Sequence, residues 1–509
     1  MQIRTLAGST ALAALAFGSA GWADVTPEEV WQNWQDMSAS YGQSMTASAQ
    51  RTEGDRLTVE GLKVVFKQEG SEVEATIDEV RFNGNDDGTV DVTMSDSYPV
   101  TMVIDDIPAE GEVAGEPTRI GITVRQPGLK MTAGGGGEET SYVFSIPTLE
   151  IGVDEVDGVD AAAMELKADI TLTDTQGSYL VKGLETKTLT SDFSAATAEM
   201  VLRMKDEESS GVMNMRASLT DLKGTSGGTL VPGVDMADMA AALKAGFSSK
   251  ADFTYGPTTM EFDFTDGADS AKGSASTASG RFNVAMDDRT LAYGGAANSV
   301  NMTMSGTQIP FPQLTVNYAE AAFDLLMPIA KAEAPQDFRL LTKLVDLKIS
   351  EEIWAMFDPT KQLPRDPATL VIDASGKAQL DVDVLDPAAQ AAMETAPPGE
   401  IHALDVNALR LSAAGAELTG TGGFTFDNSD KTTFPGMPLP TGKMELKLVG
   451  GNGLLDKLVA MGLIPQDQAM GARMMLGMFA RTVEGQEDTL TSDLEFKDKG
   501  FYANGQRLQ

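Results

Sequence analysis

Hydrophobic and polar residues alternate along most of the chain from residue 56 onward. The alternation begins with Leu57 and Val59, and Gly, Asp, Asn or Pro residues separate each run from the next. A period of two between turn residues is typical of antiparallel β-strands. The same alternating pattern recurs at 119–125, 142–151, 166–173, 178–190, 198–204, 213–222, 251–265, 280–287, 299–316, 368–384, 403–427 and 441–449. The chain is therefore predicted to be mainly β, with an α+β fold built on antiparallel strands.

The segment before these strands has the period of a helix. Thr26 is a suitable N-cap, Pro27 fits the first helical position, and Glu29 completes a capping box. The apolar face of this helix would consist of Val30, Trp34, Met37 and Tyr41, widened by Trp31. We expect this face to dock the helix onto the body of the protein rather than to stack on a ligand.

A few further segments also have a helical pattern. They are residues 235–246, about 318–330, 338–345, 350–357, 452–463 and 466–480. The segment 329–338 (IAKAEAPQDF) is the best candidate for a boundary between two lobes. The predicted domains are therefore an N-terminal β-rich lobe with its leading helix, 24–330, and a C-terminal β-rich lobe with helices, 331–509.

Residues 1–23 have the composition of a secretory signal peptide. Arg4 supplies the positive charge, 6–17 is a short apolar run, and Gly21 and Ala23 suit cleavage before Asp24. The apolar run is too short to be a permanent membrane helix, and no later segment is apolar enough to be one. We expect an exported protein that is periplasmic and soluble after cleavage, without a transmembrane anchor.

Charge and the lack of cysteine exclude several classes of function. The formal net charge is −37, which repels nucleic acid and anionic membrane surfaces. The chain has no cysteine, so it has no disulfide, no thiol chemistry and no thiolate metal site. Its 42% hydrophobic content is enough for a folded core. We predict no nucleic-acid partner.

Catalytic chemistry finds little support in the sequence. His402 is the only histidine, at the start of a strand pattern, and a surface or strand-end role suits it better than catalysis. The nucleophile elbow, the zinc-protease helix motif and the phosphate-binding loop are all missing from the sequence. No residue is assigned to a catalytic, cofactor-binding or metal site, and we predict that the protein is not an enzyme.

The stretch RFNGNDDGTVDV, 81–92, has the spacing of a calcium loop. Asn83, Asn85 and Asp87 are two residues apart and Gly88 follows, as in the first half of an EF-hand loop. The position of the closing bidentate glutamate is occupied by Met94, and the flanks have a strand period. Asp-Gly between alternating apolar runs is a hairpin signal, so a hairpin tip is the prediction here.

Other acidic groups have the same ordinary interpretation. Asp381 and Asp383, and the stretch from Asp154 to Asp160, are predicted to lie on a solvated strand face or in a turn.

Methionine is unusually abundant, with 27 residues. Several fall on predicted helices: Met236, Met239, Met461, Met470, Met474, Met475 and Met478. Methionine is flexible and polarizable, so it suits surfaces that accept apolar partners of varied shape. The preferred interpretation is that these side chains fill a core between helix and sheet; the alternative is that they form part of an apolar groove.

Three C-terminal stretches resemble a known family. WAMFDPTKQLPRDPATLVIDASGKAQL (354–380), PLPTGKMELKLVGGNGLLDKLVAMGLI (438–464) and LTSDLEFKDKGFYANGQRLQ (490–509) resemble the family of domain of unknown function 2125. DVTPEEVWQNWQDM (24–37) and TIDEV (76–80) are similar to exported members. The resemblance implies an envelope protein with no established activity. The closing KGFYANGQRL is also similar to AsmA-like long β-sheet proteins, which implies an extended, curved sheet able to hold acyl chains.

Two functions remain open at this point. The first is a periplasmic protein that binds or carries a lipid or other apolar ligand in a groove of the sheet. The second is a structural or interaction protein of the cell envelope, with a packed core, an envelope protein as partner and no small-molecule ligand. A hydrolase that uses carboxylates or His402 is a third, weaker hypothesis. The first two differ in whether one face of the sheet is open or covered.

Overall fold

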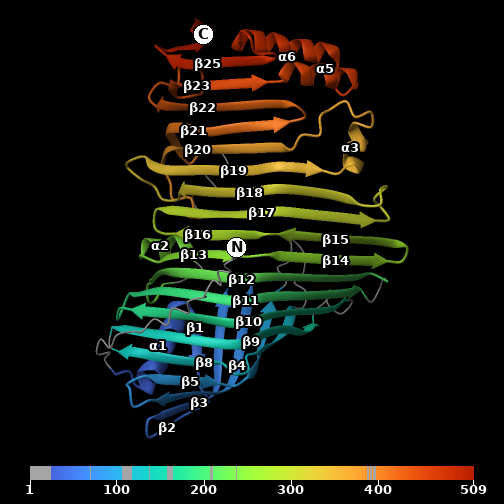
Figure 1. The fold of residues 1–509 in the computed structure, drawn as a ribbon. Helices are drawn as coiled ribbons and strands as arrows, with labels where there is room; N and C mark the ends of the chain where they lie inside the picture. The colour runs from blue at the N-terminus through green and yellow to red at the C-terminus, as the bar shows by residue number, and fades with distance from the viewer. Residues whose placement is uncertain are drawn as a thin grey trace, which may run out of the picture.

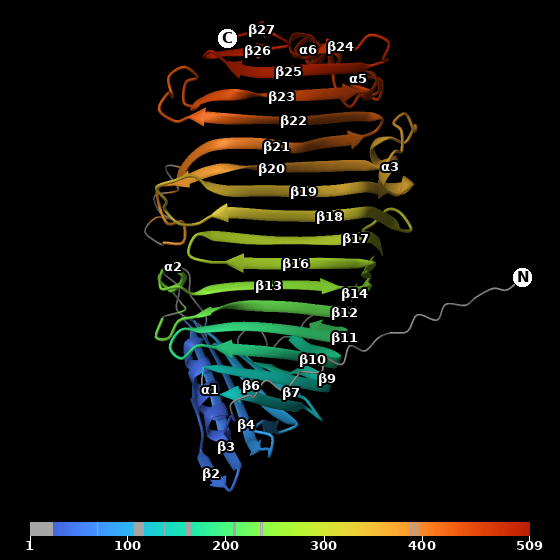
Figure 2. The ribbon, with the colours of Figure 1, turned by 60° about the vertical axis from the view of Figure 1, so that its left-hand side comes forward.

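The computed structural model describes residues 24–68, 70–105, 117–136, 138–157, 164–206, 210–234, 236, 238–386, 389, 393 and 397–509. The predicted signal peptide, 1–23, lies outside these residues. The described strands belong to one sheet of 27 strands, in which every pairing is antiparallel. Figures 1 and 2 show the strands from β10 to β25 stacked one above another along one long axis. The prediction of a mainly β fold with an extended antiparallel sheet is confirmed.

The N-terminal end of the sheet is branched. Its strands are β1 (Gln43–Thr46), β2 (Ala49–Glu53), β3 (Arg56–Gln68), β4 (Ser71–Gly84), β5 (Val90–Met94), β6 (Ser97–Ile104), β7 (Thr118–Arg125), β8 (Lys130–Gly136) and β9 (Glu139–Asp157). β3 pairs with β1, β2 and β4, and β4 pairs with both β5 and β6. The two branches rejoin at β9 through β8 and β7.

The middle of the sheet is made of long strands. They are β10 (Met164–Lys182), β11 (Lys187–Asp206), β12 (Val212–Leu230), β13 (Ser248–Tyr255), β14 (Thr258–Asp266), β15 (Asp269–Thr277), β16 (Ser279–Met286), β17 (Thr290–Gly306), β18 (Leu314–Pro328) and β19 (Gln336–Ile349). β12 pairs with β13 along one half and with β14 along the other, and β16 and β15 bring both halves to β17. Between β12 and β17, the short strands β13 and β14 thus occupy the place of one long strand, and β16 and β15 occupy the place of a second.

The C-terminal end continues the ladder. Its strands are β20 (Ala368–Leu380), β21 (Gly399–Ala413), β22 (Ala416–Asp427), β23 (Leu439–Val449), β24 (Arg481–Thr482), β25 (Thr489–Lys497), β26 (Gly500–Ala503) and β27 (Gln506–Arg507). Each strand from β19 to β23 pairs with the next, and β23 pairs with β25. The hairpin β25–β26 turns at Asp498 and Lys499, and β26 pairs in turn with β27.

The leading helix has the predicted cap. Helix α1 (Pro27–Ser40) starts after Thr26, whose hydroxyl accepts a hydrogen bond from the Glu29 N–H. The Glu29 carboxylate accepts in return from the Thr26 N–H at 2.8 Å, which completes the capping box. Val25 and Val30, on either side of the cap, are both buried. Local sequence therefore defines where this helix begins.

The remaining named helices are short and lie at the margins of the sheet (Figure 1). They are α2 (Met239–Lys244), α3 (Glu351–Phe357), α5 (Gly451–Ala460) and α6 (Gln466–Phe479). The last three confirm the predicted segments 350–357, 452–463 and 466–480. α2 is shorter than the predicted 235–246 because it begins only after Asp238, whose side chain accepts from the Ala241 N–H at 2.9 Å. No described helix is long and apolar enough to cross a membrane.

Two predicted helices are strands, and those predictions are wrong. Residues 318–330 lie mostly in β18 and 338–345 lie in β19, and the two strands pair with each other. Both segments carry apolar side chains on both faces, such as Leu325 beside Leu326, which hid the period of two. The connection between them, 329–335, is part of the proposed boundary; the division into 24–330 and 331–509 stays a prediction.

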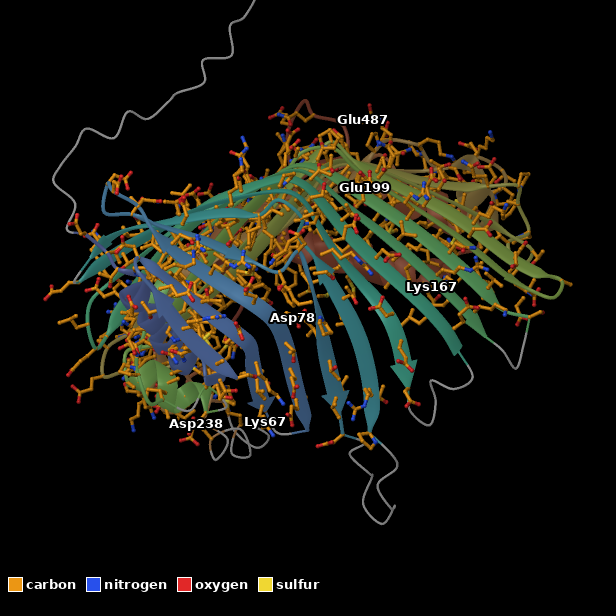
Figure 3. The ribbon with its side chains drawn as sticks, turned by 90° about the horizontal axis from the view of Figure 1, so that it is seen from below. Lys67, Asp78, Lys167, Glu199, Asp238 and Glu487 are labelled. Atoms are coloured by element: carbon orange, nitrogen blue, oxygen red, sulfur yellow. The ribbon has the colours of Figure 1, made fainter. Side chains whose placement is uncertain are left out.

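A line of kinks runs across the long strands. Asp174 in β10, Asp221 in β12, Ser299 in β17 and Asp346 in β19 have φ between 49° and 55°, and each lies at a break in the pairing. Aspartate tolerates this left-handed region better than most residues. Such irregularities bend strands and increase their twist. Seen from below, the sheet is arched rather than flat (Figure 3).

The stretch 354–380 begins with a buried ion pair between Asp358 and Arg365, which we call the clasp. Asp358 is fully buried and accepts hydrogen bonds from the backbone N–H groups of Gln362 and Leu363, both at 2.9 Å. Arg365 donates to the same carboxylate at 2.6 Å, and its guanidinium lies 4.3 Å from the centre of the Trp354 ring. The clasp therefore joins α3 to the segment that enters β20.

Acid should release this clasp. Burial alone would raise the pKa of Asp358, but the hydrogen bonds from Arg365, Gln362 and Leu363 lower it to about 2. An unfolded aspartate has a pKa of about 3.9, so the stabilisation is complete above about pH 4 and is lost as the pH falls toward 2. Asp358→Asn should lower the urea midpoint at pH 7, and the gap to the wild type should close between about pH 4 and 2. The matched control is Asp366→Asn at an exposed position nearby; a gap that is independent of pH would contradict the role of Asp358.

Candidate functional site

Cross-strand pairing shows that one face of the sheet is apolar from end to end. Residues directly opposite each other on paired strands point to the same face. One continuous row of such partners contains no charged side chain. It runs through Val90, Ala133, Tyr142, Tyr179, Ser191, Ser226, Ala251, Val284, Tyr293, Leu325, Leu340, Ala374, Val406, Gly422, Met444, Leu494 and Ala503. The row extends from β5 to β26, and we call the face that it marks the apolar face.

Two further rows on this face have the same character. The first runs through Leu57, Phe82, Val92, Met131, Phe144, Gly177, Phe193, Gly224, Phe253, Phe282, Gly295, Phe323, Thr342, Ile372, Leu409, Gly420 and Leu446. The second runs through Val124, Ile151, Ile170, Met200, Ala217, Met260, Ala275, Met302, Val316 and Ile349. Together the rows make a broad apolar surface across most of the sheet.

Aromatic rings and glycines alternate in the first of these rows. A Cβ atom placed on Gly224 would lie only 2.7 Å from Cε1 of Phe253, so the ring lies directly over the glycine. The ring of Phe338 covers Gly376 in the same way, with the same 2.7 Å separation. Each of these two rings therefore occupies the space that a side chain in place of the glycine on the paired strand would fill. The result is a smooth surface of rings instead of a layer of upright side chains.

The opposite face is polar and charged. A row of partners on it runs through Ser178, Asp192, Thr225, Asp252, Asn283, Gly294, Asp324, Leu341 and Asp373. Arg281 pairs with Asp324 at 2.9 Å and Arg339 with Asp373 at 3.3 Å. The two faces of the sheet thus differ sharply in polarity. Such a difference is common in antiparallel sheets, in which one face is polar and solvated and the other is apolar.

The polar face also holds a depression of about 590 Å³, over the paired strands β11, β12, β14, β15 and β17. Its lining carries charges of both signs, including Arg216, Glu261, Asp263 and Lys272. Lys272 and Asp263 pair with each other at 3.1 Å. The mixed, partly neutralised lining gives no preference for a ligand charge, so we do not assign the site to this depression.

Helix α1 covers the apolar face at the N-terminal end. Trp31 and Trp34 lie with their rings 6.0 and 5.3 Å from the ring of Phe82, which is fully buried. Tyr142 and Tyr179 stack at 4.3 Å beside the helix. Burial raises the pKa of both tyrosines, so their hydroxyls stay protonated. The predicted docking role of the aromatic face of α1 is confirmed, and this end is a closed core.

Helix α2 covers a second, smaller part of the apolar face. Ala242 and Leu243 are buried against Leu230 and Ile329, and Met239 packs at the rim of this cluster. Lys244 at the end of the helix pairs with Asp383 at 2.8 Å. Figure 3 shows α1 and α2, in blue and green, beneath the arch of the sheet, with Glu199 on the outer side. The apolar face therefore lines the inner side of the arch.

Between these helices and the C-terminal end the apolar face is exposed. Phe253, Phe282 and Phe323 keep 38%, 44% and 41% of their surface accessible. Tyr293, Met302, Met304 and Leu340 are exposed on the same face. Soluble monomers rarely leave contiguous apolar patches of more than a few hundred Å² uncovered. Within the described part of the chain, the middle of this face is therefore exposed rather than packed in a core. We call this exposed inner surface of the arch the trough.

His402 lies in β21 at an irregularity of the pairing between Lys377 and Ala378. Among the described residues its Nε2 atom is buried without a hydrogen-bond partner. No described hydrogen bond links it to a serine or a carboxylate, so the described structure does not assemble a catalytic triad around it. The assignment of no catalytic residue stays a prediction.

The calcium-like stretch forms the tip between β4 and β5. Asp87 accepts hydrogen bonds from the N–H and hydroxyl of Thr89, at 3.1 and 2.6 Å, and these bonds lower the pKa of Asp87. The Asn85 amide donates to the Thr89 hydroxyl, and Gly88 has a φ of 78°. The predicted hairpin tip is confirmed, and its side chains are used within the turn.

The other acidic residues are also engaged in local structure. Asp383 accepts from the Lys331 N–H at 2.8 Å, and with Lys244 this contact lowers its pKa. Asp154 accepts a hydrogen bond from the Thr123 hydroxyl. Residues 158–160 of the Asp154–Asp160 stretch lie outside the described residues. Among the described residues no cluster of three or more acidic or histidine side chains could hold a metal ion.

The methionines divide into two groups. Met236 and Met239 pack against the α2 cluster, as the core interpretation predicted. Met470, Met474, Met475 and Met478 on α6 are exposed instead, so the preferred interpretation is wrong for them. Both groups have spacings that suit a helix, three residues in the first and mainly four in the second, so the spacing alone does not tell a buried group from an exposed one. Sequence reasoning also missed the ring-over-glycine rows, because they depend on the register between strands.

Comparison with known proteins identifies one family. The family model described as "Uncharacterized protein conserved in bacteria (DUF2125)" matches residues 241–505. No curated protein matches the chain. Among solved structures, the ferric citrate transporter FecA in its unliganded form is 7% identical over 91% of this chain and 76% of that chain. Its TM-score of 0.16 is too low to support any conclusion. The similarity to AsmA-like proteins stays a prediction.

The rings over glycine can be tested by adding a methyl group. Gly224→Ala would place Cβ against the Phe253 ring, so the ring must lift or the strands must shift. We expect a loss of about 1–3 kcal/mol of unfolding free energy, which urea unfolding measures. In the control, Gly121→Ala, the nearest atom to the new Cβ would be 3.6 Å away. Equal effects of the two substitutions would contradict the close contact.

The hairpin tip predicts a clear result in a calcium titration. Because the Asp87 carboxylate is used by Thr89, calcium should leave the melting temperature of the wild type unchanged. Asp87→Ala should lower the melting temperature slightly, by the same amount with and without calcium. A rise with calcium that disappears in Asp87→Ala would show a metal site instead.

Proposed function

The chain belongs to the DUF2125 family of uncharacterised bacterial proteins, and we propose that it binds or carries the apolar part of a lipid, or another apolar molecule, on the apolar face of its sheet. The observation that carries the proposal is the exposed middle of that face. Rows of apolar partners cross it without a charge, and its phenylalanines remain about 40% accessible.

The chemistry of the face favours a long, flexible and apolar ligand. Its surface is made of phenylalanine, methionine, leucine and glycine, with few groups able to fix a polar ligand by directed hydrogen bonds. Ser191 and Ser226, which interrupt one row, hydrogen-bond to each other at 2.7 Å. Burial of apolar surface is non-directional, so the face would accept chains of varied shape. The proposal involves no catalysis and no cofactor.

The place of action that fits this function is the periplasm. The proposal combines the predicted signal peptide, residues 1–23, with the charge of −37 and the absence of cysteine. A protein that holds apolar molecules between two membranes needs an accessible apolar surface for the ligand and a well-solvated outer surface. The arched sheet has both, with the charged face outside and the apolar face inside (Figure 3).

The alternative is a structural or interaction protein of the envelope without a ligand. The closed core beneath α1 favours it, because that end of the sheet has no room for a ligand. It does not account for the aromatic residues left exposed from β13 to β18. We therefore prefer the binding function.

A charge placed on the apolar face should weaken ligand binding. Met302→Glu puts a carboxylate in the middle of the face, where an apolar ligand would have to desolvate it. We expect at least about tenfold weaker binding of a fluorescent fatty acid, a change of about 1.4 kcal/mol. Its neighbour Asn301 is also exposed but points to the polar face, so Asn301→Glu is the matched control.

The result for the control decides the interpretation. Asn301→Glu should bind the fatty acid as the wild type does. Equal affinities for both variants and the wild type would contradict binding on the apolar face, provided that all three melt at similar temperatures.

A further inference from the structure

Helix α6 exposes the side of its surface that should be buried. Met470, Met474 and Met478 follow each other at four-residue spacing and so share one side of the helix. They keep 62%, 66% and 52% of their surface accessible, and Met475 beside them is also exposed. Ala469, on another side, is the buried residue of the helix. We call these four methionines the methionine patch.

The part of α6 that carries the methionine patch contains an arginine and no acidic residue. Between Gln468 and Ala480 the chain has no acidic residue, although its net charge is −37. Arg473 lies within this stretch and Arg481 follows it, and both are exposed. Arg473 reaches Asp456 of α5, which holds the two helices together. An apolar helix face flanked by arginines is typical of helices that lie in the interface of a membrane.

The position of the patch links it to the apolar face. α5 and α6 connect β23 to β24 and β25, and two of these strands, β23 and β25, carry Met444 and Leu494 near the C-terminal end of an apolar row. Figures 1 and 2 show this helical pair at the C-terminal end of the stack, far from α1. The end of the trough that carries no α1 is therefore the end that carries the patch.

We propose that the methionine patch of α6 docks the C-terminal end of the sheet onto the surface of a lipid bilayer. The four methionines enter the boundary between headgroups and acyl chains, and Arg473 and Arg481 contact phosphates. The choice of a bilayer rests in part on the proposed function, because a bilayer is the source of apolar ligands. A second copy of the chain suits the patch less well, since it would bring the same arginines against each other.

Flotation with vesicles of phosphatidylcholine tests the proposal directly. The wild type should float with the vesicles, and Met474→Asp should reduce the bound fraction at least about tenfold, because the carboxylate would enter the bilayer boundary. Gln486→Asp adds the same charge at an exposed position that follows α6 in the chain and lies outside the methionine patch, so this variant should float as the wild type does. Met474→Gln, which adds no charge, should give an intermediate loss and guards against a folding defect.

The apolar-face variant separates this proposal from the proposed function. Met302→Glu should float normally, and Met474→Asp should bind the fluorescent fatty acid normally. If Met474→Asp floats like the wild type, or if the wild type does not float, membrane docking is overturned. A wild-type dimer that Met474→Asp converts to a monomer, with no flotation of either, would overturn it in favour of a second copy. A monomeric wild type that does not float would overturn it in favour of a protein partner.

Discussion

Backbone hydrogen bonding along one antiparallel ladder is the interaction on which the rest of this structure depends. The described strands form one sheet, and outside the clusters beneath α1 and α2 its apolar face has little cover. Without cysteine there is no disulfide to hold the strands. The ladder fixes the register, and the register in turn decides which side chains share a face. A slip by one residue would move the apolar side chains to the charged face.

The apolar face follows from that constraint together with two local devices. Positive-φ residues such as Asp174 in β10 and Asp221 in β12, on either side of β11, bend the strands at the same level, so the strands stay in register while the sheet arches. Glycines such as Gly224 and Gly376 leave room for a ring from the next strand. The first device gives the trough its curvature and the second gives it a smooth apolar lining. The bends and the glycines together produce an apolar surface that remains accessible and is not filled as a core.

Much of the fold could be predicted from local patterns, because strand period, caps and turn residues act within a few positions. Thr26 with Glu29 predicted the start of α1, and Asp87-Gly88 predicted the tip between β4 and β5. The segment 318–330 was misassigned because Leu325 and Leu326 place apolar groups on both faces of one strand. The apolar face could not be predicted as a whole, since it depends on the register of many strands at once. The exposure of Met474 likewise depends on how α6 packs and not on its spacing in the sequence.

Native mass spectrometry of the protein, expressed from the full sequence including residues 1–23 and purified without detergent, tests the central claim most directly. If the apolar face holds a ligand, the protein should retain an adduct of lipid mass that organic extraction removes and identifies. Met302→Glu should lose the adduct, and Asn301→Glu should keep it. A wild-type protein that is repeatedly found at its bare mass, and that takes up no added lipid, would contradict the account.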